Sequence, residues 1–177
     1  RSSAESDVYK RQDKDTLANL KIKCLVLKHK EEDCKQVKDL KYSDEIQYIV
    51  SHKTRNDFIS RLCDKLSGNT LCLYQLVEKH GVILYNLMKD FDRKVFFIHG
   101  GTDTETREKI RAITEKETNA IIVASYGTFS TGINIRNLHN VVFASPSKSR
   151  IRVLQSIGRG LRKSDRDDIH TTLLDIA

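Results

Sequence analysis

The 177-residue sequence contains no tryptophan, a single proline and a single methionine, Met88. So few chain-breaking prolines favour a regular domain of helices and parallel strands over a loop-rich sandwich. No apolar run approaches the roughly 20 residues that a membrane-spanning helix requires, and no signal peptide is visible. We therefore expect a cytoplasmic protein with no membrane partner.

The cysteines also follow none of the usual functional spacings. Cys24, Cys34, Cys63 and Cys72 form no CxxC pair, and no histidine cluster has metal-ligand spacing. Zinc modules and disulfide scaffolds are recognised by such spacings. We expect reduced thiols and assign no metal ligand.

What the chain does have is charge, together with enough apolar residues for a core. It is 38% hydrophobic and 31% charged, with a net charge of +7 and a pI near 9.2. A basic surface attracts polyanions, so nucleic acid is a candidate partner. Many basic proteins bind no nucleic acid, and charge alone leaves the question open.

From Gly68 onward, short apolar runs alternate with helical patterns. Continuous apolar runs indicate strands covered on both faces, hence a parallel sheet with helices on each side. Ligands bind such sheets at the carboxyl ends of the strands, here after Val77, Ile98, Ala124 and Ala144. The predicted strands are 21–27, 70–77, 95–98, 120–124, 141–144 and 172–176, and the predicted helices are 54–66, 78–89, 104–115 and 148–163.

The helix predicted at 148–163 carries the most informative pattern, SRIRVLQSIGRGLRK. Gln155, Arg159 and Arg162 form one stripe beside an apolar one, and Gly158 between the stripes allows a ligand to come close. Two arginines one turn apart form a fork suited to phosphate oxygens. The alternative is a solvated basic helix face whose arginines pair with nearby aspartates.

Two further segments follow predicted strands. In ASYGTFSTGIN (124–134), Gly127 and Gly132 with neighbouring hydroxyl groups could hold phosphate oxygens in a nest of amides. A tight turn with ordinary capping hydroxyls is the alternative. His99-Gly100-Gly101 follows the strand at 95–98, where a single histidine is more often structural than catalytic and a glycine pair can form an ordinary turn.

Taken in order, HGG, STGIN and QSIGRGLR resemble motifs IVa, V and VI of superfamily 2 helicases over about residues 68–177. The sequence of residues 124–162 is still more similar to phage recombination helicases, which remodel DNA. The resemblance implies an α/β fold: a RecA-like parallel sheet with helices on both faces, the C-terminal lobe of a P-loop NTPase-type helicase without its own P-loop. It also implies a partner, the N-terminal RecA-like lobe of the same protein.

The resemblance assigns roles to individual residues. Arg159 and Arg162 look like arginine fingers that reach the γ-phosphate of ATP, and Gln155 would position the nucleotide or its attacking water. Gly132, Asn134 and Gly158 would lie at the nucleotide; most relatives carry Asp where this chain has Asn134. The residues expected to line a groove along DNA phosphates are His99, Gly100, Ser125, Thr128 and Thr131.

The remainder of a motor is not found in these 177 residues. ATP and Mg²⁺ require a GxxxxGK[ST] loop and an Asp-Glu pair after a buried strand, and neither occurs. Asp44-Glu45 follows no buried strand and is interpreted as coincidence.

The first residue is not Met, and residues 171–177 end within an apolar run, so we expect a piece of a longer protein. Residues 1–16 would be a polar tail or linker, 17–67 the connection from a missing first lobe, and 68–177 the C-terminal lobe, truncated at its end.

Four functions remain open at this point. The leading one is the second lobe of an ATP-dependent DNA helicase, inactive by itself. The same motifs occur in RNA helicases and restriction translocases. A stand-alone nucleic-acid-binding module would use the arginine fork directly on DNA phosphates, and a nucleotide-free α/β scaffold would use it for neither.

Overall fold

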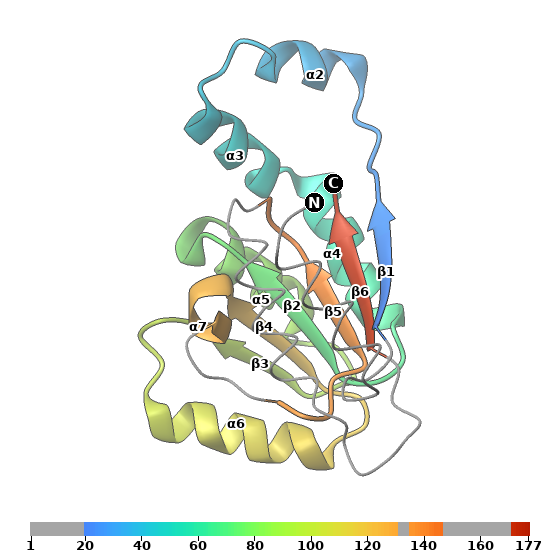
Figure 1. Ribbon diagram of the computed structural model, residues 1–177. Helices are drawn as coiled ribbons and strands as arrows, with labels where there is room; N and C mark the ends of the chain where they lie inside the picture. Colours follow the sequence, from blue (N-terminus) through green and yellow to red (C-terminus); the bar gives the residue numbers. More distant parts are fainter. Residues whose placement is uncertain (1–19, 131–134, 147–170) are drawn as a thin grey trace, which may run out of the picture.

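The computed structural model describes residues 20–130, 135–146 and 171–177, which form a parallel six-stranded sheet (Figure 1). The strand order is β1-β6-β5-β2-β4-β3, and every neighbouring pair is parallel. The strands are β1 (Leu20–Leu25), β2 (Thr70–Tyr74), β3 (Val95–Ile98), β4 (Ile121–Ser125), β5 (Asn140–Phe143) and β6 (Thr171–Ile176). This is the parallel sheet that the apolar runs predicted.

Helices cover both faces of the sheet. On one face lie α4 (Lys53–Lys65) and α5 (Val82–Met88), the latter preceded by a π-helical turn, η1 (Val77–Gly81). On the other face lie α6 (Thr104–Lys116) and the short α7 (Tyr126–Ser130). Of the remaining described helices, α2 (Glu31–Val37) stands beyond the tip of β1 in Figure 1 and buries no residue, whereas α3 (Tyr42–Ser51) contacts α4 and η1.

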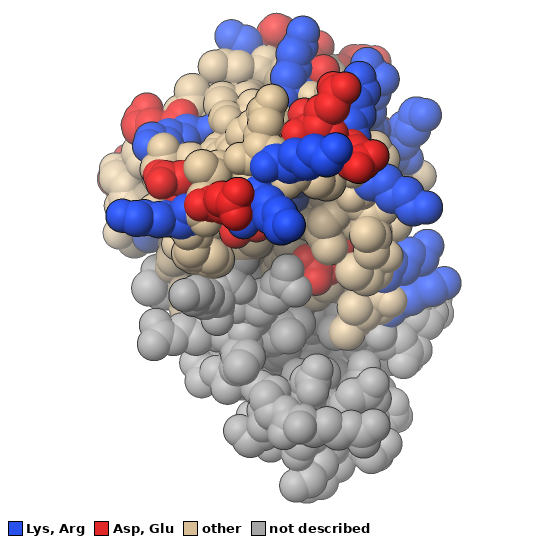
Figure 2. All heavy atoms as spheres, turned by 90° about the horizontal axis from the view of Figure 1, so that it is seen from above, with Lys and Arg blue, Asp and Glu red and all other residues tan. Residues whose placement is uncertain are grey.

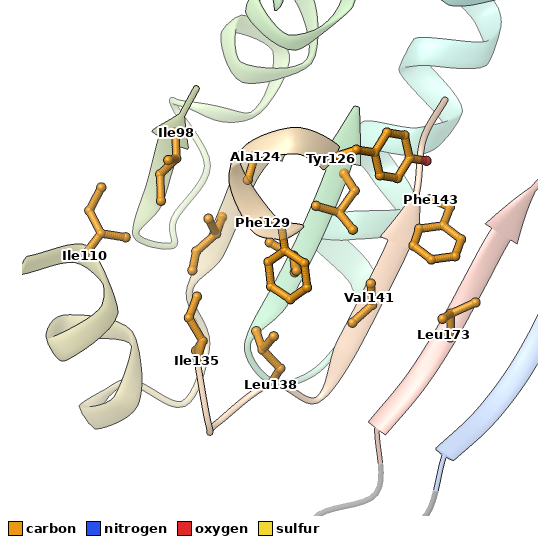
Figure 3. Close-up of a cluster of buried hydrophobic side chains, with 13 residues drawn as sticks. Ile98, Ile110, Ala124, Tyr126, Phe129, Ile135, Leu138, Val141, Phe143 and Leu173 are labelled. Atoms are coloured by element: carbon orange, nitrogen blue, oxygen red, sulfur yellow. The ribbon is translucent and has the colours of Figure 1, made fainter. Parts of the chain in front are cut away.

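Alternating residues of each central strand enter two separate cores. Leu71 and Leu73 of β2 point to the α6 face, whereas Cys72 and Tyr74 point to the α4 and α5 face. Because side chains alternate along a strand, burial on both sides requires a continuous apolar run. Figure 3 shows the first core, which extends over the sheet from Ile110 of α6 to Leu173 of β6.

Within the described residues, the predicted elements agree with the observed ones to within two residues at their ends, with four exceptions. The strand predicted at 70–77 ends at Tyr74, and the helix predicted at 78–89 begins as a π-helical turn. Helices α3 and α7 were not predicted. Asp44-Glu45 lies in the first turn of α3 and not at a strand end, as its interpretation as coincidence implies. The helix predicted at 148–163 lies outside the described residues.

The segment predicted as a connection contributes to the same sheet and core. β1 pairs with β6 along its whole length, and Ile59 and Cys63 of α4 are fully buried against β2, β4 and β5. Helix α4 and the sheet thus share one core. The predicted boundary at residue 68 between a connection and the C-terminal lobe stays a prediction.

Asn69 immediately precedes β2 and forms hydrogen bonds at the amino-terminal ends of the strands. Its side chain is fully buried, accepts from the Ala120 N–H at 2.8 Å, and donates to three backbone carbonyls, those of Thr114, Glu117 and Asn137, at 2.7–2.9 Å. Gly68 before it has φ +93°, and a Cβ there would lie 2.5 Å from the His139 ring. Only glycine adopts this conformation without strain, so Gly68 turns the chain from α4 into β2.

Candidate functional site

The predicted site residues divide into two groups. His99, Gly100, Ser125 and Thr128 lie in the described part of the chain, at the carboxyl ends of β3 and β4. The others lie outside the described residues, and their roles stay predictions; these are Thr131, Gly132, Asn134, Gln155, Gly158, Arg159 and Arg162.

The His99-Gly100-Gly101 segment forms a tight turn after β3. The Thr102 N–H donates to the His99 carbonyl at 3.0 Å, and the His99 N–H donates to the Thr102 hydroxyl at 3.1 Å. The Gly101 N–H donates to His99 Nδ1 at 3.1 Å, which fixes the ring over the turn. A Cβ on Gly101 would lie 3.0 Å from that ring, whereas one on Gly100 would meet nothing within 4 Å. Gly100 is thus exposed with open space before it, which permits a close approach by a ligand.

Arg107 of α6 forms hydrogen bonds with the backbone of this turn. Its guanidinium donates to the carbonyls of His99 at 3.3 Å and Gly100 at 3.0 Å. With both carbonyls bound to α6, the turn is anchored to a rigid helix. No signal in the sequence points to Arg107, because nothing in its spacing distinguishes it from the other charged residues of α6.

The second segment brings its hydroxyls inward. Ser125 and Thr128 are 8% and 4% exposed, and their oxygens are 2.6 Å apart. The Thr128 N–H also approaches Ser125 Oγ at 3.3 Å, so Ser125 caps the first turn of α7. This is the capping arrangement that the sequence left open as an alternative, and phosphate binding by the two hydroxyls stays a prediction.

The sheet places the two segments side by side. β3 and β4 pair in parallel with Ile98 opposite Ala124, so His99 and Ser125 leave neighbouring strands at the same level. In parallel sheets this edge, beyond the carboxyl ends, is where ligands bind. The described part of the candidate site is therefore a continuous edge formed by the His99–Thr102 turn and the start of α7.

A buried arginine organises the other half of this edge. Arg55 of α4 is 3% exposed and donates to the carbonyl of Ala144 at 2.6 Å and to that of Ile176 at 3.1 Å. These carbonyls lie at the ends of β5 and β6, where the ladder has no further partner for them. Buried carbonyls without a donor are costly, so Arg55 ties α4 to the strand ends.

Next to Arg55, a closed hydrogen-bond chain runs through His80 of η1. Ser145 Oγ accepts from the Gln75 N–H at 3.1 Å and lies 2.6 Å from His80 Nδ1. His80 Nε2 lies 3.0 Å from Asn56 Oδ1, and Asn56 donates its Nδ2–H to the Val50 carbonyl at 2.8 Å. Every atom finds a partner if His80 is neutral, with its proton on Nε2.

Burial, followed by the nearby charge of Arg55, lowers the pKa of His80 from 6.5 to about 3. The unfolded chain therefore binds this proton at a higher pH than the folded chain does. We expect the free energy of unfolding to fall as pH drops from 6.5 to about 3, by at most about 1.4 kcal/mol per unit from this group. Chemical denaturation at several pH values measures the slope. The slope should flatten in His80→Gln, and equal slopes in the two proteins would contradict this assignment.

In the described part of the surface seen in Figure 2, Lys and Arg are interspersed with Asp and Glu. The described surface seen there is therefore not a continuous basic field. Much of the net charge of +7 comes from residues 147–170, in which Lys and Arg outnumber Asp and Glu by seven to three. Attraction of a polyanion is thus expected to depend strongly on that segment.

No helix among the described residues has the length and apolar character needed to cross a membrane. In the same residues, a single cluster of histidine and acidic side chains has a geometry that could hold a metal ion. It lies near the end of β1, away from the His99 turn.

With this fold and edge in view, comparison with known proteins defines the class. Residues 54–164 match the helicase conserved C-terminal domain, and the chain belongs to that family. Its sheet and helices are those of the RecA-like C-terminal lobe of helicases.

The chain is also similar to a particular protein, the ATP-dependent DNA helicase uvsW of Enterobacteria phage T4. The chain is 40% identical to it over 158 residues, which is 88% of this chain and 31% of that protein. The crystal structure of T4 UvsW matches with a TM-score of 0.77 and 39% identity over 91% of this chain and 33% of that one. The yeast DEAD-box splicing factor Prp28 matches with a TM-score of 0.56 and 16% identity over 92% of this chain and 30% of that one, which shows a shared fold. The chain thus spans about a third of the length of its phage relative.

Proposed function

We propose that this chain is the second motor lobe of an ATP-dependent DNA helicase or translocase that acts on branched or duplex DNA. The observation that carries the proposal is the pairing of β3 with β4, which sets the open Gly100 turn beside the start of α7 at one edge. Similarity to a protein named a DNA helicase favours DNA over RNA as the nucleic acid.

In this proposal the two segments at the edge form part of a track for one DNA strand. Gly100 offers backbone close to the surface because no side chain blocks it, and Arg107 fixes that backbone to α6. Ser125, Thr128 and Thr131 would continue the track with hydroxyl and N–H groups. Contacts of this kind read the phosphate backbone, so binding should be salt-sensitive and only weakly selective for sequence.

The nucleotide would be shared between two lobes. ATP and Mg²⁺ would be held mainly by a first lobe, with Gly132, Asn134 and Gly158 of this chain facing the nucleotide. Arg159 and Arg162 would contact the terminal phosphate across the cleft and stabilise charge that develops during hydrolysis. Gln155 would orient the nucleotide or the attacking water. The carboxyl edge described above fits this arrangement because it is the ligand-binding edge of a parallel sheet.

The proposal predicts where ATP hydrolysis occurs. The 177-residue chain alone should hydrolyse no ATP, whereas a protein that joins it to a first lobe with a P-loop and an Asp-Glu pair should do so, faster when DNA is added. A coupled-enzyme assay with and without single-stranded DNA measures this. Hydrolysis by the 177 residues alone would show that the nucleotide site was assigned to the wrong part of the protein.

The coding sequence upstream of Asp13 offers a second, independent test. An uninterrupted reading frame with GxxxxGK[ST], followed by a buried strand that ends in Asp-Glu, supports the motor. A start codon shortly before Asp13, with no such lobe encoded nearby, favours a stand-alone nucleic-acid-binding module.

A further inference from the structure

A cluster of metal-ligating side chains lies at the end of β1. His29 follows β1, Asp33 belongs to α2, and His52 is the N-cap residue of α4. One ligand atom from each lies within 4.8 Å of the other two. These residues have no recognisable metal-ligand spacing in the sequence, and only the fold of α2 and α3 brings them together.

We propose that His29, Asp33 and His52 bind one Zn²⁺ ion. Tetrahedral zinc with bonds of about 2.0–2.1 Å requires ligand atoms about 3.3–3.5 Å apart. His52 Nε2 and Asp33 Oδ2 are already 3.7 Å apart, and the imidazole rings of His29 and His52 are 5.2 Å apart in an edge-on arrangement. Small side-chain movements therefore bring the three atoms to coordination distance.

Neighbouring groups form hydrogen bonds with two of the proposed ligands, Asp33 and His52. Tyr48 donates its hydroxyl proton to Asp33 Oδ1 at 3.1 Å, which orients the carboxylate and leaves Oδ2 facing His52. Such outer hydrogen bonds are typical of metal sites. The Arg55 N–H meets His52 Nδ1 at 3.4 Å, a long contact. Zinc on Nε2 puts the ring proton on Nδ1, so binding gives up only this weak contact.

The surroundings leave room for the ion and select its type. The three residues line a cavity of about 520 Å³, and the side chains of Asp33 and His52 are only 26% and 20% exposed. Water can supply the fourth ligand, because the cavity is open to solvent at His29, one of its lining residues. Lys28 and Lys30 line it as well, so charge alone does not hold a cation there. Imidazole nitrogen favours Zn²⁺ over Ca²⁺ or Mg²⁺, which take mainly oxygen ligands.

Bound zinc would act as a clamp. It would connect the segment after β1, the first turns of α2 and the start of α4, three pieces of chain that otherwise share few contacts. α2 buries no residue of its own, so an ion on Asp33 would be its main attachment. Zinc should therefore slow tryptic cleavage at the lysines of α2 and of the segment that follows it.

Calorimetric titration of the full chain, without a histidine tag, with Zn²⁺ tests the proposal. We expect one ion per chain with a dissociation constant in the micromolar range or tighter. His29→Gln, Asp33→Asn and His52→Asn should each weaken binding by about tenfold or more. Asn is itself a good N-cap and Asp33→Asn keeps an acceptor for Tyr48, so these variants should fold, as circular dichroism will show.

Cys34→Ser is the matched control, because the exposed thiol of Cys34 lies next to Asp33 in the chain. It should leave zinc affinity unchanged, and Co²⁺ bound to the native protein should show no thiolate charge-transfer band. The proposal is overturned if no zinc binds, if any of the three ligand variants retains native affinity, or if Cys34→Ser abolishes binding.

Discussion

Replacing Arg159 by Ala is expected to lower ATP turnover by about 10³–10⁵-fold in the protein that contains both motor lobes. The expected cause is loss of the guanidinium that stabilises charge on the phosphates during hydrolysis. DNA affinity should change little, because the proposed track is formed by the His99–Thr102 turn and the start of α7. Steady-state ATPase rates and fluorescence anisotropy with labelled DNA measure the two effects separately.

Two variants sharpen this experiment. Arg159→Lys keeps the charge but loses the two-pronged donor geometry, so it should also be strongly impaired. Arg152→Ala removes an arginine from the same predicted helix, outside the QxxGRxxR pattern, and should retain most of the activity. If Arg159→Ala instead abolishes DNA binding and leaves ATP turnover intact, the fork serves DNA phosphates and the chain is a binding module.

Replacing Asn69 by Ala is expected to destabilise the fold by about 3 kcal/mol or more. The substitution removes the acceptor for the Ala120 N–H and the donors for the carbonyls of Thr114, Glu117 and Asn137. The Asn69 side chain is fully buried, so the substitution also leaves a cavity lined by these polar groups. Urea denaturation measures the loss.

The isosteric change Asn69→Asp separates hydrogen bonding from packing. It keeps the shape and the acceptor for Ala120 but points a second oxygen at three carbonyls, so it should destabilise at least as much as Ala does. Asn86→Ala, at an exposed position of α5, is the control and should change stability by less than about 0.5 kcal/mol. If Asn69→Asp retains native stability, the three carbonyl contacts contribute nothing.

Both halves of the carboxyl edge depend on contacts that span the sequence. Arg55 binds a carbonyl 89 residues away and another 121 residues away. His80 joins Ser145, 65 residues on, to Asn56, 24 residues back. A clamp at His29, Asp33 and His52 would act on the first turn of α4, which carries Arg55. His52 of the proposed metal site and Arg55, which binds the strand ends, are thus one turn apart along the start of α4.

The sequence by itself determined the class of fold and the family. Strands buried on both faces need continuous apolar residues, so β2, β4 and β5 could be located within a residue or two at their starts. The helix predicted to begin at residue 104 does begin there, and the side chain of Asp103 before it accepts from the Thr106 N–H at 2.8 Å. HGG, STGIN and QSIGRGLR are local strings in a fixed order, and the family match covers residues 54–164.

Only the tertiary structure decided which polar side chains meet. Ser125 and Thr128 follow a predicted strand, but the burial of their hydroxyls and the hydrogen bond between them depend on the turn into α7 and could not be derived from the sequence. Arg55, Asn69, His80 and Arg107 gave no signal in the sequence, since each acts on backbone or side-chain groups brought close by the sheet. Hydrophobic periodicity is a local property that a sequence displays directly, whereas the partners of a buried polar group depend on strand order and register.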